Sequence, residues 1–240
     1  MIRNLYRTYL YIVCIALLIV VSVAVNGLLG VLLSQTPLRG QDGVAADHSE
    51  IVQAVTFAIV AFIVGGLIGG LHYWLLRRDM HADPAADGGA VRAFFLNLSA
   101  AIAALIAIGA FASTISQLGY PADRASYSLA TALAAAGFYA VVEWERRRAL
   151  ATTRTALAFQ RLHLFGVPFV TVLIAAGIWM SAVGTSLTAL FGRLGLAAQC
   201  TDVNSPSCYY GYGITTPRAI IFQWVALLWL GSAWYAYVWL

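Results

Sequence analysis

The chain has 240 residues, of which 61% are hydrophobic and 10% charged, and its formal net charge is +4. A soluble domain carries about 25% charged residues, so this composition, with a mean hydropathy of +0.81, excludes an ordinary soluble protein. All 14 basic residues are Arg and lie near the ends of apolar runs, so they do not form the contiguous basic face that nucleic-acid binding requires.

Six apolar runs divide the chain. Each is long enough, or nearly so, to cross about 30 Å of hydrocarbon as a helix, which takes roughly 20 residues. The runs lie near 5–33, 51–76, 93–118, 126–142, 165–190 and 217–240. The first run is longer than the apolar core of a signal peptide, so it is predicted to stay in the protein as a signal anchor. The sequence therefore predicts a single all-α transmembrane domain over residues 1–240, a polytopic bundle of six helices.

The distribution of Arg predicts how the bundle is oriented. Ten Arg fall on one side of the predicted membrane: Arg3, Arg7, Arg77, Arg78, Arg92, Arg146, Arg147, Arg148, Arg154 and Arg161. The other side has four, namely Arg39, Arg124, Arg193 and Arg218. Basic residues gather in cytoplasmic loops, so both the N-terminus and the C-terminus are predicted to lie in the cytoplasm.

Two cysteines lie in the loop between the fifth and sixth runs, which this topology places outside the cytoplasm. Cys200 and Cys208 are separated by seven residues rich in Ser and Pro, in a compartment that permits disulfide bonds. We expect a Cys200–Cys208 bridge; the alternatives are two free thiols or a metal site, for which two Cys without a nearby His are a poor ligand set. Cys14, within the first run, is expected to be an inert packing residue.

The odd-numbered runs begin alike, with an Arg, then aromatic residues, then a long aliphatic stretch. The second and fourth runs both end with a Trp one turn before an Arg cluster, at Trp74 and Trp144. Interfacial aromatic residues and flanking Arg are common in membrane helices and explain part of this similarity. The shared order predicts three hairpin repeats in the same orientation, at about 1–78, 92–148 and 161–240.

Two stretches carry a resemblance to a known family. The segment 3–11, Arg-Asn-Leu-Tyr-Arg-Thr-Tyr-Leu-Tyr, and the segment 74–78, Trp-Leu-Leu-Arg-Arg, are followed by a second hairpin. In this the chain resembles an uncharacterised bacterial multipass membrane family, classed as a domain of unknown function and common in filamentous phototrophic bacteria and their relatives. The resemblance, best over the first four runs, implies the architecture and a bacterial inner membrane. It implies no activity and no functional residues.

Small residues predict where helices approach closely, because lipid tails do not drive helices together and backbone contact must. The second run holds Gly65, Gly66, Gly69 and Gly70, which form two overlapping GxxxG pairs. The fourth run holds a stripe of small residues at four-residue spacing: Ser128, Ala132, Ala136 and Ala140. We expect the glycine face to pack on the third or fourth run within the chain, with docking of another subunit as the alternative.

Few residues of the sequence point to catalysis, ion transport or cofactor binding. No charged residue lies near the centre of a run, which disfavours a coupled ion transporter, and no catalytic motif is present, so we expect no enzyme. His72 and His163 fall near the cytoplasmic ends of the second and fifth runs, where they could face one plane as haem or chlorin ligands. The simpler interpretation is two interfacial His, so no cofactor and no metal is predicted.

The sequence is therefore interpreted as a non-enzymatic integral protein of the bacterial cytoplasmic (inner) membrane. The most specific hypothesis is an accessory or scaffold subunit of a larger membrane complex, respiratory or photosynthetic, whose partners are membrane lipids and other membrane subunits. A small transporter or channel is one alternative. A haem- or pigment-binding protein using His72 and His163 is the other.

Overall fold

In the computed structural model the described residues, 2–40, 43–83, 89–119, 125–149, 153–194 and 217–239, are almost entirely helical and include no strand. The helices are α1 (Ile2–Ser34), α2 (His48–Val64), α3 (Gly70–Ala82), α4 (Ala90–Gln117), α5 (Ala125–Arg147), α6 (Arg154–Arg193) and α8 (Pro217–Trp239). A 3₁₀ turn, η1 (Pro37–Arg39), follows α1, and a π-helical turn, η2 (Gly65–Gly69), joins α2 to α3.

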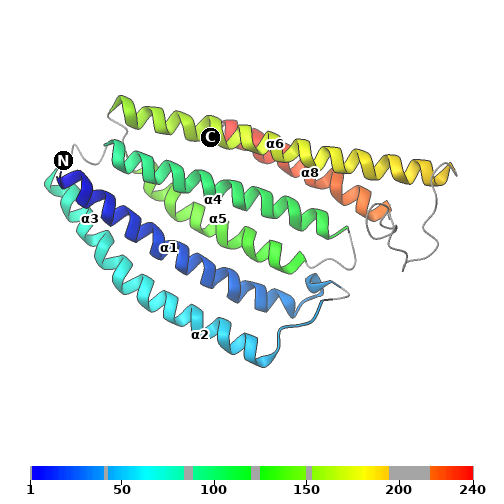
Figure 1. The fold of residues 1–240 in the computed structure, drawn as a ribbon, viewed down its shortest axis with the longest axis horizontal. Helices are drawn as coiled ribbons and strands as arrows, with labels where there is room; N and C mark the ends of the chain where they lie inside the picture. Colours follow the sequence, from blue (N-terminus) through cyan, green and yellow to red (C-terminus); the bar gives the residue numbers. More distant parts are fainter. Residues whose placement is uncertain are drawn as a thin grey trace.

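Six helices of the described chain are long and apolar enough to cross a membrane, which confirms the predicted all-α membrane bundle. They are Arg3–Ser34, His48–Ala82, Ala90–Gln117, Ala125–Arg147, Arg154–Phe191 and Pro217–Trp239. The second is α2, η2 and α3 in succession, and Figure 1 shows that it is bowed. Bending is expected there, because a π turn interrupts the regular α-helical hydrogen bonding.

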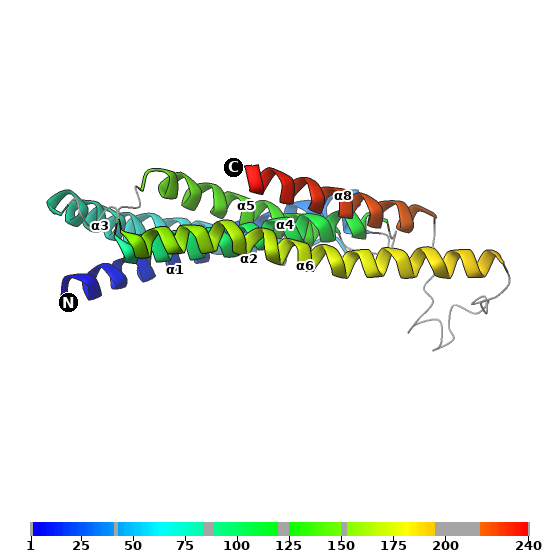
Figure 2. The ribbon, with the colours of Figure 1, turned by 90° about the horizontal axis from the view of Figure 1, so that it is seen from above.

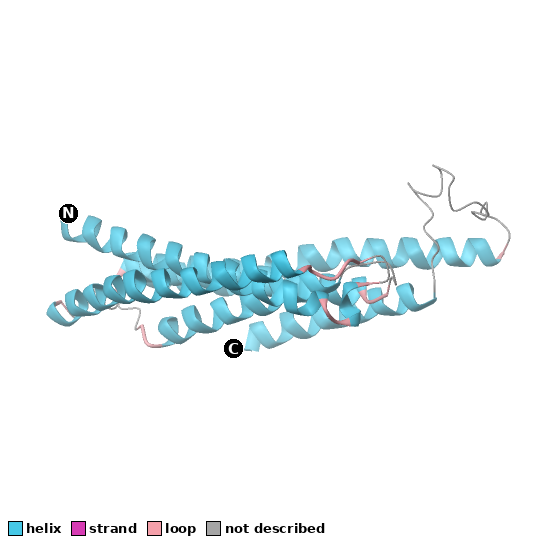
Figure 3. Cartoon of the chain, turned by 90° about the horizontal axis from the view of Figure 1, so that it is seen from below, coloured by secondary structure: helices cyan, strands magenta, loops and turns pink. Residues whose placement is uncertain are grey.

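Helix α6 is the longest and begins before the apolar run that predicted it. It has 40 residues, which corresponds to about 60 Å, or twice the hydrocarbon thickness of about 30 Å. Figures 2 and 3 show α6 extending past the other helices at the end where α8 begins. Hydropathy located the apolar part of this helix but not its polar first turns, because these turns add no apolar signal.

The helices lie side by side in an extended, layered bundle (Figure 1). α2 and α3 pack on α1, α1 packs on α5, and α5 packs most extensively on α4. On its other side α4 contacts α6 and α8, which also pack on each other. The two arms of each hairpin therefore pack on each other: α1 with α2 and α3, α4 with α5, and α6 with α8. α2 forms the outer layer on one side.

Alanine is the most frequent buried residue of α4 and of α5, which lets these helices approach their neighbours closely. On α4 the buried alanines are Ala100, Ala103, Ala104, Ala107 and Ala112, and on α5 they are Ala125, Ala130, Ala132 and Ala134. Within the predicted stripe of α5, only Ala132 is buried; Ser128 and Ala136 are partly buried, and Ala140 is exposed. The buried positions are spread wider than one stripe because α5 contacts both α1 and α4.

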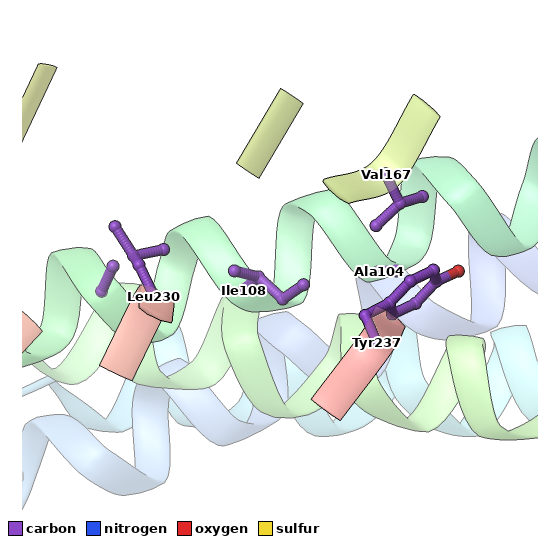
Figure 4. Close-up of a cluster of buried hydrophobic side chains, with 6 residues drawn as sticks. Ala104, Ile108, Val167, Leu230 and Tyr237 are labelled. Atoms are coloured by element: carbon purple, nitrogen blue, oxygen red, sulfur yellow. The ribbon is translucent and has the colours of Figure 1, made fainter. Parts of the chain in front are cut away.

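A buried apolar cluster joins α4, α6 and α8 (Figure 4). Ile108 of α4, Val167 of α6 and Leu230 of α8 contribute its aliphatic side chains. Ala104 of α4 and Tyr237 of α8 belong to the same cluster. Many large apolar side chains on the outer faces of the helices are exposed, as expected for a surface that lipid covers.

The glycine-rich segment packs on α1, so the prediction that its neighbour is the third or fourth spanning helix is wrong. A Cβ atom built on Gly65 would lie 2.5 Å from Cγ2 of Val21, and one on Gly69 would lie 3.6 Å from Cδ1 of Leu17. Bulky side chains of α1 thus fill the groove that the glycines leave. The physical reason is the order of the layers: α2 is outermost, and α1 separates it from α4 and α5.

Candidate functional site

Most charged side chains described in the bundle lie at the end where α1 begins, and many of them form ion pairs with one another. Arg7 of α1 donates to Asp79 at 2.5 Å and to Asp83 at 2.9 Å, and Arg3 donates to Asp79 at 3.1 Å. The hydrogen bond from Arg7 is the main cause that lowers the pKa of Asp83 from its ordinary value. These ion pairs tie the first turns of α1 to the end of α3.

A second ion-pair group joins three helices around Glu145 of α5. Arg92 of α4 is only 2% exposed and donates to Oε1 of Glu145 at 2.7 Å. Arg77 of α3 donates to Oε2 of the same carboxylate at 3.0 Å, and the hydroxyl group of Tyr73 lies 3.2 Å from that oxygen. The carboxylate of Glu145 therefore holds α3, α4 and α5 together at this end.

Glu143 and Glu145 of α5 have different partners, although both lie next to the same Arg cluster. Glu143 accepts from Arg146 at 2.6 Å and from Arg147 at 2.9 Å. Glu145 points instead to Arg77 and Arg92 of other helices. The signal that could have found this pairing is the presence of Arg77, Arg92 and Glu145 at helix ends on the same predicted side of the membrane.

His163 is buried between α4, α6 and α8, and both ring nitrogens are hydrogen-bonded. Nδ1 lies 2.9 Å from the main-chain oxygen of Asn97, so this nitrogen must carry the hydrogen, since a carbonyl oxygen only accepts. Nε2 of the neutral ring then accepts from the hydroxyl group of Tyr237. With both nitrogens engaged, the geometry of His163 is that of a structural hydrogen-bonding residue.

His72 lies in a different part of the bundle. It belongs to α3 and is partly exposed, with Nδ1 at 2.8 Å from the main-chain oxygen of Ile68 and Nε2 at 3.5 Å from the hydroxyl group of Tyr9. The layers formed by α1, α4 and α5 separate α3 from α6 (Figure 1). The structure does not bring His72 and His163 to one site. Among the described residues, no group of three or more His, Cys, Asp or Glu could hold a metal ion.

An apolar cavity with a volume of about 540 Å³ opens sideways between α1 and α4, with α5 as its floor. Its walls are aliphatic, and its polar lining comes from Ser22, Asn26, Ser99 and Thr131. We refer to it as the lateral cavity. Hydropathy could not reveal it, because an apolar side chain in a membrane helix can face lipid, another helix or a cavity without any change in the sequence pattern.

The outer face of the glycine segment is the other open feature. Gly66 and Gly70 are exposed, and no atom of a described residue outside their own helix lies within 4 Å of a Cβ atom built on either of them. We call Gly66 and Gly70 the outer glycine pair. The four glycines therefore serve two faces: Gly65 and Gly69 face α1, and the outer glycine pair faces away from the rest of the described chain.

The predicted disulfide cysteines, Cys200 and Cys208, lie outside the described residues, so their bridge stays a prediction. Cys14 of α1 is a free, partly buried cysteine. It lines neither the lateral cavity nor any of the ion-pair groups described above.

Comparison with known proteins adds one finding. No curated protein and no solved structure matches the chain. A family model described as a domain of unknown function matches residues 7–119, which contain most of α1, all of α2, α3 and α4, and the loops between them. The match therefore covers the first three spanning helices and ends before α5, whereas the sequence resemblance was placed over four. Across residues 7–119 the chain is matched by the family DUF5671, a domain of unknown function.

Proposed function

We propose that the chain is a non-enzymatic accessory or scaffold subunit of a larger complex in the bacterial cytoplasmic membrane. Its termini would lie in the cytoplasm, and its partners would be membrane lipids and at least one other membrane polypeptide. A respiratory or photosynthetic complex is the partner that the family resemblance favours, and this part of the proposal rests on analogy alone.

The observation that carries the proposal is the outer glycine pair. Glycine costs a helix about 0.8–1 kcal/mol relative to alanine, and close contact between helices is what repays this cost in a membrane. Contact with α1 accounts for Gly65 and Gly69, because larger residues there would meet Leu17 or Val21. It does not account for Gly66 and Gly70, which have the four-residue spacing of a helix-pairing motif and a bare surface around them.

The polar groups support a structural role. Arg7, Arg92, Glu145 and His163 all contact partners on other helices. Buried or partly buried groups held this way act as ties between helices. The geometry at His163 gives no support to a haem or chlorin ligand, and nothing described at the polar end favours a transport path.

The experiment compares complexes extracted from the native membrane in mild detergent and resolved on a native gel. In the wild-type chain we expect a band larger than the monomer, containing a second membrane polypeptide. The double variant Gly66→Leu/Gly70→Leu should lose this band and keep a folded monomer, because no described residue outside the helix contacts either glycine. The matched control is Gly137→Leu, another exposed glycine without neighbours, on α5.

Three outcomes would contradict the proposal. The wild-type chain could run as a lone monomer in its native membrane extract. The double variant could keep the larger band unchanged. The Gly137→Leu control could remove the band as fully as the double variant, which would show that any large residue on an exposed surface has this effect.

A further inference from the structure

The lateral cavity is a groove that runs along the bundle and is open on one side. On α1 its lining runs from Ile12 to Asn26, which corresponds to about 21 Å of helix. Ile19 of α1 and Ile102 of α4 both line it, and α5 contributes the remaining wall. Its volume of about 540 Å³ falls in the range of small-molecule sites, about 300–1,000 Å³.

The two ends of the cavity differ in chemistry. Phe95 of α4 and Phe138 of α5 line the end nearest the start of α1. Asn26 and Thr131 line the opposite end, where the Thr131 hydroxyl group lies 3.3 Å from Oδ1 of Asn26. The cavity is therefore apolar along most of its length. Asn26 and Thr131 form a polar pair at one end, and Ser99, one turn from Phe95 on α4, is the polar residue at the other.

The amide nitrogen of Asn26 can donate to an occupant. Among the described residues no acceptor is hydrogen-bonded to Nδ2 of Asn26, whereas Oδ1 has Thr131 beside it. Asn26 is partly buried, and an amide donor beside an apolar cavity is best satisfied by an acceptor on the ligand.

The depth of Asn26 in the membrane indicates which acceptor group of a ligand its amide nitrogen would meet. α1 has 33 residues, and its midpoint is Leu18, so Asn26 lies eight residues, or about 12 Å, from the middle. The half-thickness of the hydrocarbon is about 15 Å, which places Asn26 just inside its edge when α1 is centred in the bilayer. This is the depth at which the acyl chains of a phospholipid join their ester groups.

From this arrangement we infer that the lateral cavity binds a membrane phospholipid. One extended acyl chain occupies the groove from Asn26 towards Phe95 and Phe138, and the ester carbonyl oxygen of that chain accepts from Nδ2 of Asn26. The opening between α1 and α4 faces the bilayer, so the lipid enters sideways.

Other occupants fit less well. A transmembrane helix about 10 Å wide and 30 Å long needs roughly 2,400 Å³, far more than the cavity offers. Water is disfavoured, because apolar cavities stay dry. A polar solute would leave its own groups unpaired against Ile19, Leu98 and Ile102.

The test uses the full chain reconstituted in vesicles of phosphatidylethanolamine and phosphatidylglycerol, with a trace of phosphatidylglycerol that carries a photoreactive diazirine at the end of one acyl chain. After irradiation, the labelled residues are identified by mass spectrometry. Phe95 and Phe138 should be labelled about tenfold more than Phe165, which is exposed to bulk lipid on α6. A tenfold preference corresponds to about 1.4 kcal/mol.

Two variants and a control complete the experiment. Ala135→Phe places a ring in the cavity and should abolish the excess labelling at Phe95, whereas Ala140→Phe, at an exposed position on the same helix, should not. Asn26→Leu leaves the cavity apolar and open but removes the donor, so it should reduce the excess labelling of the wild-type chain about tenfold.

Equal labelling of Phe95 and Phe165 in the wild-type chain would overturn the inference. So would excess labelling that persists in Ala135→Phe or in Asn26→Leu. Displacement of the label by a long-chain isoprenoid quinone, but not by unlabelled phosphatidylglycerol, would show that the cavity prefers a different lipid class and would also overturn it.

Discussion

Tyr237 of α8 and His163 of α6 are hydrogen-bonded inside the bundle, although 74 residues separate them in sequence. The Tyr237 hydroxyl group donates to Nε2 of the imidazole ring, whose Nδ1 donates to the main-chain oxygen of Asn97 on α4. One buried side chain thus connects three helices. This hydrogen bond links α8 to α6 inside the bundle.

Replacing Tyr237 by Phe should destabilise the fold. The ring and its contacts with the apolar cluster remain, but Nε2 of His163 loses its donor, and a buried acceptor without a partner costs about 1–3 kcal/mol. The free energy of unfolding in detergent micelles, measured against denaturant, checks this. Tyr235→Phe is the control, since Tyr235 is 60% exposed and should change stability little. Equal stability of the two variants would show that the hydrogen bond contributes nothing.

Replacing Glu145 by Ala should be among the most damaging single substitutions. It leaves Arg92 buried without its carboxylate, and breaking a buried ion pair costs about 3–5 kcal/mol. Arg78→Ala is the comparison, because Arg78 is exposed and lies 5.6 Å from the ring of Trp74, a contact worth about 0.5–1 kcal/mol. The same unfolding assay measures both. Similar losses for the two variants would contradict the structural role assigned to Glu145.

The Arg7–Asp83 ion pair should make stability depend on pH in the acid range. Arg7 lowers the pKa of Asp83 in the folded chain below its unfolded value of about 3.9. The stabilisation is therefore fully present above that value and disappears as the pH falls through the folded pKa. Asp83→Asn should be less stable than the wild-type chain at pH 7, and the difference should shrink below about pH 4. A difference that stays constant down to pH 2 would contradict this mechanism.

Adjacent glycines should respond differently to the same substitution. Gly65→Leu forces a side chain against Val21 of α1 and should destabilise the monomer by about 1–3 kcal/mol, the usual cost of overpacking. Gly66→Leu meets no neighbour and should leave the monomer at least as stable as the wild-type chain. Monomer unfolding in detergent separates the two cases. If Gly66→Leu destabilised the monomer more than Gly65→Leu, then Gly66 rather than Gly65 would face α1, which would contradict the packing described here.

The orientation predicted from Arg can be tested by thiol labelling in a chain whose Cys14, Cys200 and Cys208 are changed to Ser. Val44→Cys lies in the loop after α1 and Leu157→Cys lies at the start of α6, both at exposed positions. In intact spheroplasts a membrane-impermeant reagent should label residue 44 at once and residue 157 only after permeabilisation, since positive loops stay in the cytoplasm. The opposite order would reverse the topology.

The sequence by itself determined the six spanning helices. Hydropathy over a window of about 20 residues depends only on composition and length, and a spanning segment has to be helical because lipid cannot satisfy its backbone groups. The Trp and Arg residues that end the second and fourth runs likewise lie near the ends of α3 and α5, where Trp74 is beside Arg78 and Trp144 beside Arg148.

The neighbours of each helix were decided only by the tertiary structure. Sequence reasoning assigned the glycine face of α2 and η2 to another small-residue helix, whereas bulky Leu17 and Val21 of α1 fill it. The Arg92–Glu145 pair, the His163–Tyr237 hydrogen bond and the lateral cavity also join residues that lie far apart in the chain. The physical reason is that an apolar side chain gains almost as much from lipid as from another helix, so apolarity selects no partner. Shape and a few interhelical hydrogen bonds make that choice.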